Sequence, residues 1–332
     1  MCRVLENNTI EFDNNKYLFA FNNKIYDLQS SKFIEPHYKQ YISLTTGYNW
    51  VSGYNTSYKE KLHTLLSQIF PDPELKDFYL ECLSTRMYGE TIQHFIIAKG
   101  VGGNGKSVIN TLMMESVGNY GYRLPDSVLT KSIQDGANPA IANMSNKRFV
   151  LVEEPKHDTK ICATTMKKLT GTNDLNCRTL YSTDTKTRLK TTLLCEANGL
   201  PALDVNAEAE GRRMLIATFQ SQFMTFPAYN QLTEEEKQSG KYYLANPYYS
   251  GNEFQTEYKQ ALIEILMDSF KKFQNQNYVI HPPQQAVNEA TEYMKFGDDF
   301  YGWFNSMFLR KKTGKYYLLS VFGTVLVVVN TI

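Results

Sequence analysis

The sequence predicts an α/β fold in which helices cover both faces of a parallel sheet. Short apolar stretches that are typical of buried strands alternate with helical patterns along the middle of the chain. The predicted strands are 92–98, 148–152, 175–182, 189–198 and 212–219, and the predicted helices between them are 106–117 and 160–170. Strands that alternate with helices favour a parallel sheet, because each helix returns the chain to the start of the next strand.

Composition excludes several classes of protein. The 332 residues are 42% hydrophobic and 21% charged, which excludes wholesale disorder and fits two or three domains. The net charge is +1, so a site for a polyanion must come from local clustering of basic residues. The five cysteines form no CxxC pair and no Cys/His ligand spacing, which argues against a structural zinc site and a disulfide framework.

Neither end of the chain reads as a membrane segment. The first residues lack the basic-then-apolar pattern of a signal peptide. The apolar run Tyr317–Val329 is shorter than the roughly 18–20 residues that span a bilayer, so we expect a buried strand or an irregular chain end and no membrane partner.

The pattern divides the chain into five segments. They are a strand-rich segment at 1–56 with a hairpin turn at Asn22-Asn23, a helical collar at 57–90, a core at 91–225, an insertion and helical lid at 226–310, and an irregular C-terminal segment at 311–332. Two helices are expected in the collar, the second with Pro73 in its first turn. The stretch 220–256 has no clear period and is expected to be a loop or insertion. Helices are expected at 253–273 and 284–308.

The sharpest motif is a glycine-rich loop between a predicted strand and a predicted helix. It consists of Gly100, Val101, Gly102, Gly103, Asn104, Gly105, Lys106 and Ser107, and it fits the P-loop pattern G-x-x-x-x-G-K-[ST]. Such a loop points backbone N–H groups at phosphates, and the positive end of the following helix adds to the anion site. We expect Lys106 to reach the β- and γ-phosphates of ATP and Ser107 to ligate Mg²⁺. A chance glycine-rich turn is the alternative.

Polar residues follow two of the predicted strands. Glu153 and Glu154 come directly after the strand 148–152, at the edge where open α/β sheets bind ligands. We assign Glu153 to the Mg²⁺ and Glu154 to the attacking water, with the division between them open. Asn198 ends the strand 189–198, where its amide can contact the γ-phosphate or the water. Surface glutamate pairs are common, so these assignments depend on the P-loop.

Basic residues are concentrated between 147 and 190, a segment with ten lysines and arginines and only five acidic residues. Within this segment, Lys186 and Arg188 lie in a short polar tip, 183–188, of a hairpin-like arrangement. Such a tip can contact a phosphate backbone, and a solvated loop is an equal alternative. Further along, Arg212 and Arg213 open the last predicted strand. A guanidinium stabilises the charge that spreads over a transferring phosphoryl group, although arginine pairs often form only surface ion pairs.

These motifs, in this order, resemble superfamily 3 helicases. More closely, the chain resembles the helicase part of the poxvirus-type primase-helicases of large DNA viruses, which are related to phage and plasmid primase C-terminal domains. The matching segments are GVGGNGKS, RFVLVEEP, MKKLTGTNDLNCRTLY, TTLLCEANGLP and EGRRMLIATF, and the segment from LFAFNNKIYDL to LTTGYNW resembles the domain before the helicase core.

The resemblance implies an AAA+-type P-loop NTPase core that hydrolyses ATP with Mg²⁺. It also implies a homo-hexameric ring that moves on single-stranded or forked DNA, in which an arginine of the Arg212/Arg213 pair reaches the ATP of the neighbouring subunit. The expected work is DNA unwinding in viral replication, in the host cytoplasm or a virus factory.

Two departures from the family pattern modify these expectations. No primase domain precedes residue 1, so we expect the chain to make no primers and to work with a separate primase or polymerase. The chain also ends at GTVLVVVNTI without the small DNA-binding domain of the family, which puts processive unwinding in question. Two alternatives stay open: another P-loop ATPase, such as a DNA-packaging motor or a kinase, and a helicase-derived replication or assembly partner that binds ATP without unwinding.

Overall fold

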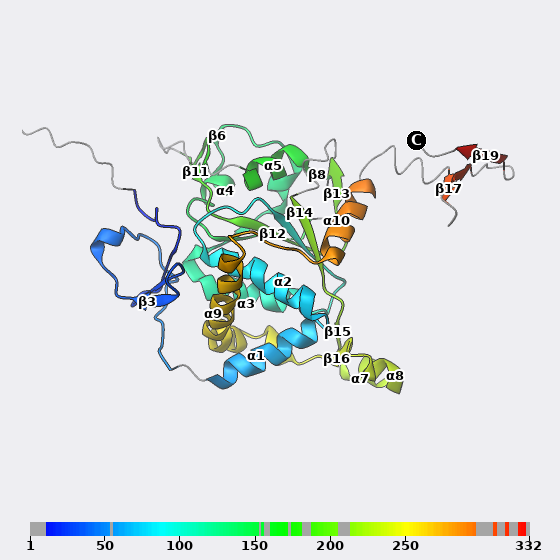
Figure 1. Ribbon diagram of the computed structural model, residues 1–332, viewed down its shortest axis with the longest axis horizontal. Coiled ribbons are helices and arrows are strands. Elements are labelled where there is room, and N and C mark those ends of the chain that lie inside the picture. The colour runs from blue at the N-terminus through cyan, green and yellow to red at the C-terminus, as the bar shows by residue number, and fades with distance from the viewer. Residues whose placement is uncertain are drawn as a thin grey trace, which may run out of the picture.

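A five-stranded sheet lies at the centre of the computed structural model (Figure 1). Its strands are β4 (Phe95–Lys99), β5 (Gly121–Leu124), β7 (Phe149–Val152), β12 (Thr192–Ala197) and β14 (Met214–Thr218). Their order across the sheet is β14-β4-β12-β7-β5, and all neighbouring strands are parallel. The parallel α/β sheet is confirmed, but the predicted strand 175–182 is not part of it: β9 (Asp174–Leu175) and β10 (Cys177–Arg178) are short strands of two separate pairs. Strand β5 was not predicted, because its sequence GYRL is short and lacks an apolar run.

The structure describes most of the chain. The described residues are 11–53, 56–152, 154–155, 160–171, 174–180, 187–204, 213–296, 308–310, 316–318 and 325–329. No helix among them is long and apolar enough to cross a membrane. Three site residues inferred from the sequence, Glu153, Lys186 and Arg212, lie outside these ranges.

Both faces of the sheet are buried. Along β4, Ile96 and Ala98 belong to one hydrophobic cluster, while Phe95 and Ile97 belong to a second cluster on the opposite face. The first cluster includes side chains from α1 (Thr56–Ile69), α2 (Pro73–Ser84), α3 (Lys106–Val117) and α9 (Asn252–Asn275), and the second includes side chains from α4 (Pro139–Ala142), α5 (Ala163–Gly171) and α10 (Gln284–Phe296). Figure 1 shows α1, α2, α3 and α9 together on one side of the sheet, with α4 and α5 on the other.

Local sequence signals position the helices around the sheet. Helix α2 has Pro73 in its first turn, as predicted, and the Asp72 carboxylate caps it by accepting from the Glu74 N–H at 2.9 Å. Helix α3 ends at Val117. Its C-cap, Gly118, has φ +53° and lies so close to the N-terminal segment that a Cβ there would be 1.8 Å from the Thr46 carbonyl oxygen. This glycine therefore fixes where the P-loop helix stops.

The remaining elements lie outside the central sheet. An N-terminal antiparallel sheet contains β1 (Leu18–Ala20), β2 (Ile25–Asp27) and β3 (Lys32–Ile34), with the predicted turn at Asn22-Asn23 between the first two. Short strands pair as β6 (Gly136–Ala137) with β10 (Cys177–Arg178), β8 (Lys160–Cys162) with β13 (Ala202–Asp204), and β9 (Asp174–Leu175) with β11 (Thr187–Arg188). Near the C-terminus, β17 (Phe308–Arg310), β18 (Tyr316–Leu318) and β19 (Val325–Val329) form an antiparallel sheet. The division of the chain into five segments stays a prediction.

The stretch 220–256 is more ordered than its sequence indicated. It contains the parallel pair β15 (Gln222–Met224) and β16 (Tyr242–Leu244), the short helices α7 (Phe226–Asn230) and α8 (Glu234–Gln238), and the 3₁₀ turn η5 (Pro247–Ser250). The pattern was not recognised because each element is shorter than the window in which periodicity shows. The helical region predicted at 284–308 is described as α10 only to Phe296.

A buried arginine links the N-terminal sheet to the core. Arg148, just before β7, is 3% exposed and donates hydrogen bonds to the Met87 and Leu18 carbonyl oxygens. Its guanidinium also lies 4.6 Å from the centre of the Tyr120 ring, a cation–π contact. One side chain therefore holds together β1, the 3₁₀ turn after α2 (Thr85–Met87) and the start of β7.

We predict that Arg148→Met lowers the free energy of unfolding by roughly 2–4 kcal/mol, because it removes two charge-assisted hydrogen bonds and leaves buried carbonyls unpaired. Urea unfolding measures the change, with Arg123→Met, an exposed arginine in β5, as the matched control. Equal stability of the two variants would contradict this role for Arg148.

Candidate nucleotide site

The glycine-rich loop lies between the carboxyl end of β4 and the amino end of α3, as its sequence context predicted. Gly103 and Gly105 have φ +77° and +83°, the left-handed region that favours glycine. A Cβ on Gly100 would lie 2.0 Å from the Asn104 side-chain amide, so a larger residue there would displace Asn104. Val101 is exposed, and Gly102 faces open space.

Asn104 shapes the loop from inside. It is 3% exposed, its Oδ1 accepts from the Lys106 N–H at 3.2 Å, and its Nδ2 donates to the Val101 carbonyl oxygen at 2.5 Å. The side chain thus stabilises the conformation of the loop. The backbone N–H groups at the start of α3 are the groups suited to binding an anion.

The Lys106 side chain is buried at the centre of the site. Its Nζ donates to the carbonyl oxygens of Gly100 at 3.0 Å and Ala197 at 3.1 Å, and to Asn198 Oδ1 at 2.8 Å. Burial lowers the pKa of this lysine, and the carboxylates of Glu196 and Glu154 act in the opposite direction. The ammonium therefore lies in a pocket of oxygen acceptors at the carboxyl edge of the sheet.

Glu154 and Asn198 form a second part of the site. The backbone N–H and the side-chain amide of Asn198 donate to the two carboxylate oxygens of Glu154, each at 3.0 Å. This pair joins the carboxyl ends of β7 and β12, which are neighbours in the sheet. Lys106, Glu154 and Asn198, three residues singled out from separate motifs, thus meet at one place.

Glu196 is a site residue that the sequence reasoning missed. Its carboxylate accepts from Ser107 Oγ at 3.2 Å and from Asn110 Nδ2 at 2.8 Å, and the Tyr79 hydroxyl donates to Asn110 Oδ1 at 2.6 Å. The available signal was a carboxylate inside the otherwise apolar strand LLCEA, two residues before Asn198. In a strand, that spacing puts both side chains on the same face.

The donors fit a magnesium ion held mainly through a nucleotide. Within the described ranges, no group of three or more His, Cys, Asp and Glu side chains can hold a metal by itself. Mg²⁺ is usually bound by one or two carboxylates together with phosphates and water. Ser107 and Glu196, in contact with each other, supply a hydroxyl and one such carboxylate, and the assignment of Glu153 stays a prediction.

Arg213 lies where the parallel strands begin, whereas the P-loop lies where they end. Its carbonyl oxygen accepts from the Phe95 N–H at the amino end of β4, whereas the P-loop follows the carboxyl end of that strand. Its Nη1 donates to the Lys167 carbonyl oxygen at 3.2 Å and to Thr170 Oγ1 at 3.3 Å, at the end of α5. The five residues of β4 separate Arg213 from the P-loop by about 15 Å.

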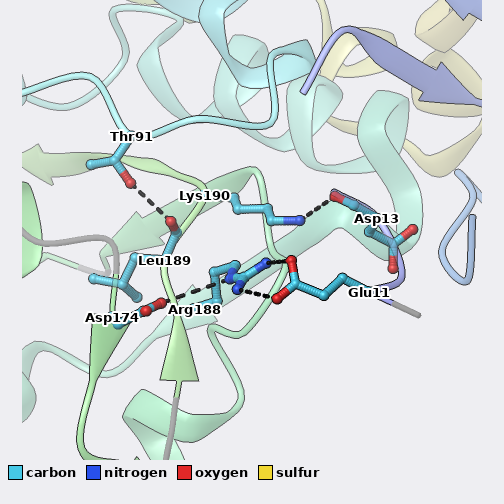
Figure 2. A network of polar contacts seen from close by, with 7 residues as sticks. All are labelled: Glu11, Asp13, Thr91, Asp174, Arg188, Leu189 and Lys190. Carbon is cyan, nitrogen blue, oxygen red and sulfur yellow. Dashed lines mark hydrogen bonds and ion pairs between the residues drawn. The ribbon is translucent and has the colours of Figure 1, made fainter. Parts of the chain in front are cut away.

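Arg188 does not lie in the expected polar tip. It is in β11, at the base of the hairpin, paired antiparallel with Asp174 in β9. Figure 2 shows its guanidinium facing the Glu11 carboxylate. The two N–O distances to Glu11 are 3.3 and 3.4 Å, and Nε lies 3.7 Å from the Asp174 carboxylate. The tip prediction was wrong for Arg188, because the strand starts earlier than the pattern indicated. DNA contact by Lys186 and Arg188 stays a prediction.

Two residues further on, Lys190 ties the same hairpin to the N-terminal segment (Figure 2). It is 5% exposed, and its ammonium donates to the Asp13 carbonyl oxygen. Burial, with the charge of Arg148 nearby, lowers the pKa of Lys190 to about 8. A buried ammonium with a lowered pKa makes the stability of this junction depend on pH.

The comparisons with known proteins agree with the motif resemblance. Residues 2–94 match the family model described as D5 N terminal like. The chain is 27% identical over 307 residues to the putative helicase L207/L206 of Acanthamoeba polyphaga mimivirus, covering 90% of this chain and 31% of that protein. It is also 27% identical over 307 residues to the primase D5 of fowlpox virus, covering 86% and 38%. The resemblance to primase-helicase proteins of large DNA viruses is confirmed.

Other similar proteins carry different names. The monkeypox virus uncoating factor OPG117 is 24% identical over 247 residues, covering 72% of this chain and 31% of that protein. Among solved structures, the apo NrS-1 C-terminal region aligns with a TM-score of 0.46 and 15% identity over 73% of this chain and 52% of that one. The chain spans about a third of the length of the curated relatives it matches.

The pKa of Lys190 predicts a pH-dependent stability. Between pH 8 and 10.5 the unfolded chain holds the proton that folded Lys190 has lost, so the free energy of unfolding rises with pH across this window. Over this pH window, the free energy of unfolding should increase by roughly 2–4 kcal/mol more in the wild type than in the Lys190→Met variant. Urea unfolding at a series of pH values measures it, with the exposed Lys160→Met as control. Parallel curves for the wild type and Lys190→Met would contradict the assignment.

Proposed function

We propose that this chain is the ATP-hydrolysing part of a DNA helicase that acts in the replication of a large DNA virus. The observation that carries the proposal is the meeting of Lys106, Glu154 and Asn198 behind a P-loop, at the carboxyl edge of a parallel sheet. The motif resemblance and the names of the similar viral proteins support the choice of helicase among P-loop enzymes.

The residues of the site have distinct tasks in this reaction. The N–H groups at the start of α3 and the Lys106 ammonium bind the phosphates, whose oxygens take the place of the carbonyl acceptors that now surround the lysine. Ser107, with Glu153 or Glu196, would hold Mg²⁺, which would supply positive charge beside the phosphates. Glu154 orients the attacking water. Asn198 contacts the γ-phosphate and, through its hydrogen bonds to Glu154, couples the position of that carboxylate to the presence of the phosphate.

The position of Arg213 supports an assembly in which the chain works as a ring. Arg213, at the amino ends of the strands, is too far from the P-loop of its own chain to stabilise charge on the transferring phosphoryl group. It can, however, face the P-loop of a neighbouring copy. Repeated head-to-tail contacts of this kind close into a ring when the rotation between successive copies closes, and form an open filament when it does not. We propose a homo-hexamer around single-stranded or forked DNA, with a separate primase or polymerase as partner, in the host cytoplasm or a virus factory.

A second candidate is an assembly or uncoating partner that uses ATP without unwinding DNA. The name of the similar monkeypox virus protein favours it. Both candidates need the nucleotide site. They differ in whether DNA accelerates hydrolysis.

Complementation between two inactive variants tests the shared site. Lys106→Ala removes the phosphate-binding ammonium, and Arg213→Ala removes the guanidinium, so each variant alone should hydrolyse little ATP. In a mixture, the intact P-loop of one chain can meet the intact arginine of the other. An equal mixture should recover up to about one quarter of the wild-type rate if the sites act independently. Steady-state phosphate release measures this.

The control mixture pairs Lys106→Ala with Arg123→Ala. Arg123 is an exposed arginine of β5, and the Arg123→Ala variant alone should keep its ATPase activity. Absence of recovery at every mixing ratio would contradict a trans role for Arg213 and leave Arg212 as the arginine of the pair. Full activity of Lys106→Ala alone would remove the P-loop assignment.

A further inference from the structure

The guanidinium of Arg188 faces carboxylates from two separate parts of the chain (Figure 2). Glu11 comes from the N-terminal segment, and its two oxygens lie 3.3 and 3.4 Å from Nη1 and Nη2 of the arginine. Asp174 comes from β9, where it is the strand partner of Arg188, and its carboxylate lies 3.7 Å from Nε. All three guanidinium nitrogens therefore face an acidic oxygen.

The contact with Glu11 has the form that arginine also uses for phosphate. A guanidinium binds a carboxylate or a phosphate through two parallel N–H···O bonds, so either anion fits the same two donors. The Arg188 and Glu11 side chains are 37% and 52% exposed, so a ligand can reach this pair from solvent. Exposed ion pairs stabilise a fold only slightly, so a phosphate can replace the carboxylate without unfolding the junction.

The chain itself keeps Glu11 close to this arginine. Two residues later, Asp13 is buried, its carboxylate accepts from the Ser43 N–H at 2.9 Å, and its carbonyl oxygen accepts from the Lys190 ammonium. A carboxylate on so short a tether has a high effective concentration at Arg188, so even a weak contact competes with a ligand from solution. Asp13 is thus the anchor of the segment, and Glu11 is the group that can exchange.

The local charges disfavour a phosphate for as long as Glu11 stays. One guanidinium and two carboxylates give the group a net charge of −1. With Glu11 away, Arg188 and Asp174 balance each other, and two N–H donors of the guanidinium face solvent. The excess of basic residues between 147 and 190 then attracts a polyanion to this part of the chain.

We propose that Glu11 is an internal competitor for a DNA phosphate at Arg188. When single-stranded DNA binds, a backbone phosphate takes the two guanidinium donors and Glu11 moves away, while Asp13 stays in place. The N-terminal segment therefore weakens DNA binding through one carboxylate. The inference rests on the function proposed above, because it needs a chain that binds DNA.

The test is a double-mutant cycle on the DNA affinity of the full chain. Fluorescence anisotropy with a labelled oligothymidine, without nucleotide, measures the dissociation constant at a series of salt concentrations. Glu11→Gln removes the competing charge and should tighten binding by about two- to fivefold, the range expected for an exposed ion pair. Arg188→Gln should weaken binding and lower the salt slope by about 0.7, the value for one phosphate contact on a single strand.

The decisive comparison is the effect of Glu11→Gln when Arg188 is already absent. The double variant should lose most of the gain, because nothing remains for Glu11 to block. The matched control is Glu35→Gln, which removes the same charge from an exposed position outside this network and should leave the affinity near that of the wild type. If Arg188→Gln does not fold, Arg188→Lys takes its place, since an ammonium lacks the two parallel donors.

Each other outcome has a distinct meaning. An equal gain from Glu11→Gln with and without Arg188, or an equal gain from Glu35→Gln, would show general charge repulsion and overturn the competition. An unchanged affinity of Glu11→Gln, with a wild type that binds DNA, would overturn it while the helicase proposal stands. Absence of DNA binding by the wild type and every variant at low salt would remove the helicase proposal and this inference together.

Discussion

The site depends on how the protein holds one buried ammonium. Placing the Lys106 charge away from water is costly unless oxygen acceptors surround it. Three acceptors do so: the carbonyl oxygens of Gly100 and Ala197 and the side chain of Asn198. They come from the ends of β4 and β12, which are adjacent parallel strands, so the sheet brings them to the lysine. Asn198 in turn is held by Glu154 at the end of β7. The parallel order of the three strands is therefore what assembles the site.

The sequence predicted the parts of this site that are encoded locally. The glycine-rich loop, Glu154 after β7 and Asn198 after β12 each follow an apolar strand, and the rule that ligands bind at the carboxyl ends of parallel strands places them together. Glu196 was missed because its role depends on contacts with Ser107 and Asn110, 89 and 86 residues earlier in the chain. A charged residue inside a buried strand was the signal that pointed to it.

Two other differences have the same physical origin. Arg188 was placed in a tip by its local composition, but it pairs with Asp174 in β9 and contacts Glu11, residues that lie 14 and 177 positions away in the chain. In the stretch 220–256, the Phe223 N–H donates to the Gly103 carbonyl oxygen, a contact between residues far apart in the sequence. Strands β4, β7, β12 and β14 and helix α3 could be read from periodicity, whereas β5, the strand register and the long-range polar contacts could not.

The measurement that tests the central claim most directly is the rate of ATP hydrolysis per chain across a series of protein concentrations. It is made with and without single-stranded DNA at one salt concentration near the physiological value, because phosphate contacts depend strongly on salt. A site that needs an arginine from a neighbouring copy predicts a rate per chain that rises with concentration and increases further with DNA. A rate that is independent of concentration and unaffected by DNA would contradict the account of a ring-forming helicase.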